Sequence, residues 1–213
     1  MSQKSENEES SDPILDAMME RRTVVLGGDI TLSSTSDVAK RLISLQMLSN
    51  DTINLIIDSS GGSLDAALRL CDLMTVVLTA PVRGIALGQC GSSATFIMLH
   101  CSERLGTPYS RFLIHSGTTN QIAIPMNHTT SENLEQLLRE ANVCKETLTQ
   151  LYMKHLTPVT WTLKTTNAAR RAFVQKLIAR GDQKFDDHMS AEEAVKVGLI
   201  ERVVHEKLDI FNY

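Results

Sequence analysis

The stretch GIALGQCGSSATFIMLHC, residues 84–101, organises the rest of the chain. An apolar run over residues 82–87 predicts a buried strand, and residues 88–91 (GQCG) are expected to break that strand. A helical pattern of apolar residues, which includes Phe96, begins at Ser92. The sequence therefore predicts that Ser92 lies at the corner between a buried strand and a helix.

A serine at such a corner has two alternative roles. Its hydroxyl can be exposed at the helix N-terminus, where free N–H groups and the helix dipole favour a developing negative charge. It can instead cap the helix, as serine often does. A candidate base lies downstream, because the apolar segment 109–114 ends at His115. A turn through Gly106 and Pro108 lets the two segments become neighbours, but His115 can equally be an edge residue whose ring bonds to the backbone.

The composition is that of an ordinary folded domain and excludes several classes of function. The chain has 213 residues, of which 42% are apolar and 22% charged. It has no apolar run long enough to cross a membrane, and its polar, acidic start does not resemble a secretory signal, so we expect a cytoplasmic protein. A net charge of −4 without a basic cluster argues against a nucleic-acid partner. Its four cysteines form no C-x-x-C pair, so neither zinc nor a disulfide framework is predicted; Cys90 is noted because it precedes Ser92 by two positions.

Strands and helices are expected to alternate along the first half of the chain. Apolar runs predict strands at 23–26, 53–57 and 82–87, and periodic apolar patterns predict helices from 36, from 64 and from 92. This order is typical of an α/β fold with right-handed crossovers and a largely parallel sheet. Residues 1–12 are expected to form a disordered acidic tail, and 13–213 a single domain that starts with a short helix or arm over 13–22.

Gly61 and Gly62 follow a predicted strand and precede a predicted helix, within the stretch Asp58–Ser63. Adjacent glycines let the backbone approach another group and point N–H donors at it, as an oxyanion hole requires. The same pair is equally consistent with a simple tight turn.

The second half of the chain is predicted to be mainly helical. Thr129 and Glu132 form a candidate capping box, and an apolar stripe then continues to His155. A helix over 131–155 with so long a stripe either packs partly on another subunit or is an ordinary surface helix. A basic helix is expected in the second part of 156–178, and Ser190–Ile200 should form a capped helix that Gly198 stops before a strand over 199–204.

Three motifs together resemble ClpP, the serine peptidase subunit of the Clp protease. They are GQCGSSAT at 88–95, LIH at 113–115 and DSSGGS at 58–63, and the resemblance covers roughly residues 23–205. It implies the superhelix of strand–helix repeats that ClpP shares with crotonases. It also implies that the 131–155 helix is the protruding handle helix by which ClpP rings stack, with an insertion at about 156–178 relative to a typical ClpP.

The resemblance also implies roles for individual residues. Ser92 corresponds to the nucleophile and His115 to the base, while the N–H groups of Gly62 and Ser93 correspond to the oxyanion hole. Counting back from Ser190 gives Asp182 as the triad acid, with Asp186 and Asp187 as close rivals. Ser60 replaces the usual proline beside the glycines. No metal and no organic cofactor are implied.

The function implied is that of a serine endopeptidase that cleaves unfolded polypeptides or short peptides inside a ring chamber. The implied assembly is a homo-oligomer of two stacked heptameric rings, a tetradecamer, and the implied partner is an AAA+ unfoldase, although residues 13–22 do not resemble the segment that lines the ClpP pore. Two alternatives remain. Because residues that flank each motif differ from those of ClpP, the chain could be an inactive ring subunit that assembles with active paralogues; it could also be a crotonase-type acyl-CoA enzyme.

Overall fold

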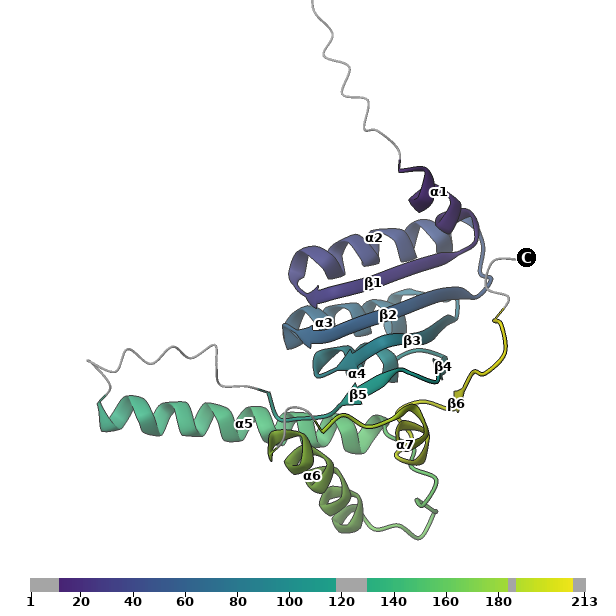
Figure 1. The fold of residues 1–213 in the computed structure, drawn as a ribbon. Coiled ribbons are helices and arrows are strands. Elements are labelled where there is room, and N and C mark those ends of the chain that lie inside the picture. The colour runs from purple at the N-terminus through teal and green to yellow at the C-terminus, as the bar shows by residue number, and fades with distance from the viewer. Residues whose placement is uncertain (1–11, 118–129, 184–186, 209–213) are drawn as a thin grey trace, which may run out of the picture.

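The computed structural model describes residues 12–117, 130–183 and 187–208, and Figure 1 shows their arrangement. Helices and strands alternate through the first half, and helices dominate the second. The elements in chain order are α1 Pro13–Glu20, β1 Thr23–Ile30, α2 Leu32–Leu48, β2 Ile53–Gly62, α3 Leu64–Asp72 with a π-helical turn Leu73–Val77, β3 Val82–Gly91, α4 Ser93–Leu99, β4 Glu103–Gly106, β5 Arg111–Leu113, α5 Ser131–His155, α6 Asn167–Gln183, α7 Ala191–Lys196 and β6 Arg202–Val203.

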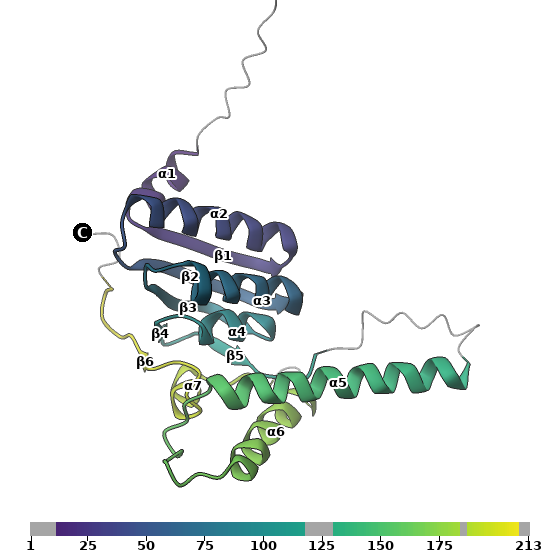
Figure 2. The same cartoon turned by 180° about the vertical axis from the view of Figure 1, so that it is seen from behind.

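A parallel sheet forms the centre of the molecule, as the alternation of elements predicts. Its strand order is β1-β2-β3-β4-β6, and β5 pairs with the end of β3. Helices α2, α3 and α4 cover one face of this sheet, which is seen from the helical side in Figure 2. The core lies between these two layers, where Leu42 of α2, Leu55 of β2 and Ile97 of α4 are fully buried. The expected α/β fold is therefore confirmed.

Three strands are longer than the sequence predicts, because glycines interrupt their register without ending them. Strand β1 continues through Gly27 to Ile30, β2 includes Gly61 and Gly62, and β3 runs to Gly91. These irregularities add one residue to β2 relative to β1 and two residues to β3 relative to β2, and they leave the pairing intact on both sides. The prediction that residues 88–91 break the strand is therefore wrong: β3 changes partner there, from β4 to β5.

Most of the predicted helices are present, with shifted ends. Helix α2 begins at Leu32 behind an N-cap at Thr31, earlier than expected. Helix α7 has the predicted capping box of Ser190 and Glu193, but the strand after it, β6, is only two residues long. The expected tail lies almost wholly outside the described residues, as does Thr129; the N-cap of α5 is Thr130.

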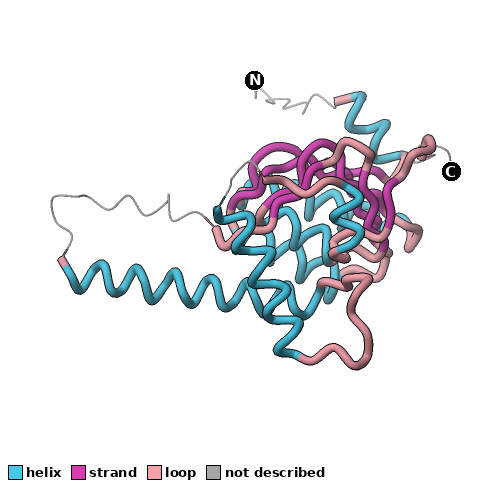
Figure 3. The backbone as a smooth tube through the Cα atoms, turned by 60° about the horizontal axis from the view of Figure 1, so that its bottom comes forward, coloured by secondary structure: helices cyan, strands magenta, loops and turns pink. Residues whose placement is uncertain are grey.

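Helix α5 projects from the body of the molecule, and Figure 3 shows the projection from below. Its apolar stripe divides into two parts. Tyr152 is fully buried and Leu148 is 5% exposed, whereas Leu134 and Leu138 are 48% and 58% exposed. Helix α6 packs against α5, where Arg171 pairs with Glu146. Within the described residues, no helix is long and apolar enough to cross a membrane.

Candidate active site

Ser92 joins β3 to α4 in a conformation that is unusual for a residue other than glycine. Its φ is +50° and its ψ is −126°, a strained region that such residues occupy mainly at functional sites. Its N–H donates to the Leu113 carbonyl oxygen of β5 at 2.8 Å, which fixes the corner to the neighbouring strand. The Ser92 hydroxyl makes no capping hydrogen bond to α4. The residue is therefore at the N-cap position, but its side chain is not used as a cap.

The two glycines at the end of β2 lie beside this corner. A Cβ atom on Gly61 would lie 2.6 Å from Ser92 Cβ, and one on Gly62 would lie 2.3 Å from the Ile30 carbonyl oxygen. Their φ values are +115° and +146°, so a side chain at either position would be strained as well as crowded. The Gly61 N–H already donates to Ser59 Oγ at 3.1 Å. Gly61 thus lets the β2 backbone lie against Ser92, and Gly62 lets it lie against Ile30 of β1.

Ser93 begins α4, and its N–H is one of the first amides of the helix, for which the helix provides no partner. Its side chain is only 2% exposed, and the hydroxyl has no hydrogen-bond partner among the described residues. Ser93 can therefore offer a backbone donor at this corner, but its own hydroxyl is turned into the interior.

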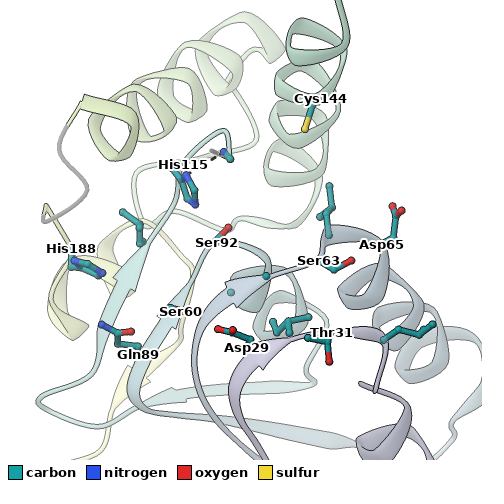
Figure 4. A pocket seen from close by; sticks show the side chains of 17 residues that line it. Asp29, Thr31, Ser60, Ser63, Asp65, Gln89, Ser92, His115, Cys144 and His188 are labelled. Atoms are coloured by element: carbon teal, nitrogen blue, oxygen red, sulfur yellow. Dashed lines mark hydrogen bonds between the residues drawn. The ribbon is translucent and has the colours of Figure 1, made fainter. Parts of the chain in front are cut away.

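A cleft of about 1030 Å³ contains both Ser92 and His115. Figure 4 shows the Ser92 hydroxyl and the His115 ring facing it. Both glycines at the end of β2 also line the cleft. The other polar residues on its wall are Asp29, Thr31, Ser60, Ser63, Asp65, Gln89, Cys144 and His188. The structure thus brings together the predicted nucleophile, base and glycine pair. Within the described residues, no cluster of His, Cys, Asp or Glu is suited to hold a metal ion.

Several of these wall residues were not singled out by the sequence analysis, among them Cys144 and His188. Cys144 belongs to α5, and its position above the cleft depends on how this helix crosses the domain. His188 lies two residues before the Ser190 cap, and no local pattern marks it. Cys90, which the sequence analysis did note, is fully buried, and burial raises the pKa of its thiol well above the ordinary value. It is an apolar packing residue and not a nucleophile.

His115 lies two residues after the end of β5 and is 8% exposed. Burial lowers its pKa, and the Asp182 carboxylate acts in the opposite direction. The Gly117 N–H donates to His115 Nδ1 at 3.2 Å. Because Nδ1 accepts this bond, the neutral ring carries its proton on Nε2.

Asp182 lies in the last turn of α6, next to His115. One carboxylate oxygen accepts a hydrogen bond from the Ser116 N–H at 2.8 Å, and the Ser116 hydroxyl lies 2.9 Å from both oxygens. Lys145 Nζ of α5 is 3.7 Å from the second oxygen. The close approach of α6 depends on Gly181, where a Cβ would lie 2.0 Å from the Ile114 carbonyl oxygen.

The rival acids have different surroundings. Asp187 receives two hydrogen bonds from the Arg180 guanidinium, at 2.8 and 3.0 Å, and this pair links α6 to the segment before α7. Asp186 lies outside the described residues. Among the described acids, Asp182 is therefore the one that is bonded to the residue following His115.

Comparisons with known proteins identify the family of the chain. The profile of the Clp protease family matches residues 5–207. The chain is 26% identical over 219 residues to the ATP-dependent Clp protease proteolytic subunit 2 of Treponema denticola, covering 98% of this chain and 94% of that protein. It is 23% identical over 198 residues to the proteolytic subunit 1 of Protochlamydia amoebophila, covering 92% of this chain and 86% of that protein.

A solved structure shows the same fold. A mutant of ClpP1 from Listeria monocytogenes aligns with a TM-score of 0.69 and 21% sequence identity, covering 93% of this chain and 99% of that chain. The expected ClpP-type fold is thereby confirmed. Because the family profile also spans nearly the whole chain, the protein belongs to the Clp protease family.

Proposed function

We propose that this chain is an active serine endopeptidase of the Clp proteolytic-subunit type. The observation that carries the proposal is the Ser92 corner: a strained backbone presents a hydroxyl that does not cap its helix to a cleft shared with His115. A strained strand-to-helix turn is a recurrent way to expose a nucleophilic serine. A crotonase-type acyl-CoA reaction would give no reason for strain at this serine.

In the proposed reaction, Ser92 Oγ attacks the scissile carbonyl carbon while His115 Nε2 takes the hydroxyl proton. His115 then gives this proton to the leaving amine, and water releases the acyl group by the same steps in reverse order. Asp182 orients the ring and stabilises the imidazolium. The N–H groups of Gly62 and Ser93 stabilise the negatively charged oxygen of each tetrahedral intermediate.

This mechanism requires one rearrangement of the present geometry. To accept a proton at Nε2, the neutral ring must carry its own proton on Nδ1, where it now accepts the Gly117 N–H. Asp182 must then accept a hydrogen bond from Nδ1–H with an oxygen that now lies near Ser116 or Lys145. A small shift of the 115–117 turn toward α6 would make both changes together.

An inactive ring subunit is the second candidate, and the hydrogen bonds of the 115–117 turn favour it. If the Gly117–His115 and Ser116–Asp182 bonds persist when substrate binds, the triad never forms. Ser92 would then be no more reactive than an ordinary serine.

The proposed substrates are unfolded polypeptides and short peptides, which a cleft of about 1030 Å³ can bind in extended form. We extend to this chain the words in the names of its relatives, which describe proteolytic subunits of an ATP-dependent protease. A ring of two stacked heptamers with an AAA+ unfoldase partner is part of the proposal, supported by the exposed apolar side chains on the outer part of α5. A cytoplasmic location is supported by four free cysteines, of which three are buried.

Hydrolysis of a set of short fluorogenic peptides tests the proposal. Ser92→Ala should reduce kcat by several orders of magnitude, since removing one member of a triad removes most of its effect. Ser93→Ala is the matched control, because its hydroxyl is buried, and it should retain most activity. A wild-type protein that cleaves no peptide would favour the inactive-subunit candidate. Full activity of Ser92→Ala would overturn the assignment of the nucleophile.

A further inference from the structure

A buried hydrogen-bond chain connects the long helix α5 to the peptide bond of Ser92. Tyr152 of α5 is fully buried, and its ring packs against Phe96 of α4 with the centroids 4.5 Å apart. The Tyr152 hydroxyl lies 2.7 Å from Thr95 Oγ1, and Thr95 is also fully buried. Thr95 Oγ1 in turn lies 2.6 Å from the Ser92 carbonyl oxygen.

The direction of these hydrogen bonds follows from their chemistry. A carbonyl oxygen can only accept, so the single hydroxyl proton of Thr95 is donated to Ser92. The Tyr152 hydroxyl must then be the donor to Thr95. Burial raises the pKa of Tyr152, so its phenol keeps the proton that this bond needs. The chain therefore runs from Tyr152 through Thr95 to Ser92 in one direction.

The Ser92 carbonyl also accepts the Thr95 N–H at 3.0 Å, so two donors from one residue hold it. This carbonyl and the Ser93 N–H belong to the same planar trans peptide and point in opposite directions. Fixing the oxygen toward the interior consequently fixes the Ser93 N–H toward the Ser92 corner. The φ of +50° at Ser92 is unfavourable for an L residue, so this orientation needs such support.

We propose that Thr95 and Tyr152 are positioning residues that hold the Ser93 N–H in the orientation required of an oxyanion donor. The inference rests on the proposed function, in which Ser93 supplies that donor. Under this inference, helix α5 influences catalysis through the Tyr152 hydroxyl, although Tyr152 itself does not touch the substrate.

Peptide hydrolysis by Tyr152→Phe, Thr95→Val and the double variant tests the proposal. An oxyanion donor acts in the transition state, so kcat should fall about tenfold in each single variant with KM little changed. Because both residues belong to one chain of hydrogen bonds, the kcat of the double variant should be no lower than that of the less active single variant. Thr95→Ser keeps the hydroxyl and should restore most of the lost kcat.

A matched control separates positioning from general stability. Thr149 is also a buried hydroxyl on α5, 1% exposed, but it bonds to the Lys145 carbonyl oxygen of its own helix. Thr149→Val should lose comparable stability and keep the wild-type kcat. A Tyr152→Phe variant with the kcat of Thr149→Val would overturn the inference, as would additive losses in the double variant.

A second readout keeps the inference distinct from the proposed function. If the wild-type protein cleaves no peptide, the proposed function fails, but amide hydrogen exchange of residues 93–99 still reports on the chain of bonds. Tyr152→Phe should then speed exchange at the first amides of α4 more than Thr149→Val does. Equal exchange in the two variants would overturn the inference whatever the catalytic result.

Discussion

The two sides of the cleft are built differently. On the nucleophile side, the Ser92 N–H bonds to the backbone of β5, and the Ser92 carbonyl accepts both the N–H and the buried hydroxyl of Thr95 in the first turn of α4. On the acid side, Asp182 is bonded to Ser116 and lies near Lys145, so side chains do much of the positioning there. The bond between Ser92 and β5 does not depend on any side chain, whereas the bond from the Thr95 hydroxyl does. A site held by side chains can differ between related proteins.

Helix α5 contacts both sides of the cleft. Tyr152 reaches Thr95 beneath the nucleophile, and Lys145, two turns earlier, reaches Asp182. A displacement of α5 would therefore change the acid side through a long, half-exposed lysine and the nucleophile side through a buried phenol. We expect the acid side to respond more readily, because an ion pair at 3.7 Å is weaker than a buried hydrogen bond.

The largest expected effect of a change on the acid side is that of Asp182→Asn. The amide cannot stabilise the imidazolium and favours the wrong tautomer of His115, so kcat should fall by about 10⁴-fold. Peptide hydrolysis under saturating substrate measures this loss. Asp187→Asn is the control, and it should remain active because its partner is Arg180. The opposite result, with only Asp187→Asn inactive, would identify Asp187 as the triad acid.

Assembly should affect both sides of the cleft together. Leu134 and Leu138 expose apolar surface on the projecting part of α5, and we propose that they pack on another subunit. Replacing both by Glu would place unpaired charge in that contact, which costs several kcal/mol per ion. Analytical ultracentrifugation should show smaller species, and peptidase activity should fall more than about tenfold.

The control for that variant is Asn142→Glu, which adds charge at an exposed position of the same helix. Leu148 is unsuitable as a test of assembly, since it is buried in its own domain and its replacement would destabilise the fold. A wild-type protein that sediments as a monomer would contradict the proposed ring.

The pH dependence of kcat should reflect the burial of His115. Burial lowers the pKa of His115, so the neutral base persists to a pH below its ordinary value of about 6.5. Activity should therefore be nearly constant from pH 8 to about 6.5 and should fall about tenfold per unit only below the lowered pKa. If kcat instead begins to fall above pH 7, the pKa of His115 is raised, and the Asp182 charge has a larger effect on it than burial has.

The smallest expected effect is that of Ser116→Ala. The Ser116 hydroxyl occupies the carboxylate that His115 needs, so its removal should favour the Asp182–His115 bond. We expect kcat to rise about two- to fivefold, a change of less than about 1 kcal/mol in the barrier. Ser110→Ala, a buried hydroxyl bonded within its own turn, is the control. A tenfold fall in Ser116→Ala would mean that Ser116 supports the active arrangement of Asp182.

Much of the nucleophile side could be predicted from the sequence, because its signals are local. The apolar run before Ser92, the helix after it and the glycines of β2 each leave a pattern within a few residues. The partner change of β3 could not be predicted, since a register shift in a strand gives the same glycine signal as a strand end. The division of the α5 stripe was hidden for a similar reason: both parts have the same periodicity, and only tertiary packing decides which is buried.

The acid side depended on the resemblance to ClpP and not on local pattern. No local motif distinguishes Asp182 from Asp187; the difference lies in the tertiary contact at Gly181, where α6 approaches the Ile114 backbone. The contacts of Ser116, Lys145 and Tyr152 join segments far apart in sequence, and no periodicity encodes them. Long-range side-chain contacts of this kind are the part of the site that a single sequence does not reveal.

Fluorophosphonate labelling tests the central claim most directly, because only a serine activated by a neighbouring base reacts at an appreciable rate. Intact-mass spectrometry of the wild-type protein should show a single adduct, and peptide mapping should place it on Ser92. Labelling should disappear in Ser92→Ala and become much slower in Asp182→Asn. A wild-type protein that stays unlabelled, or an adduct that maps to another serine, would contradict the account.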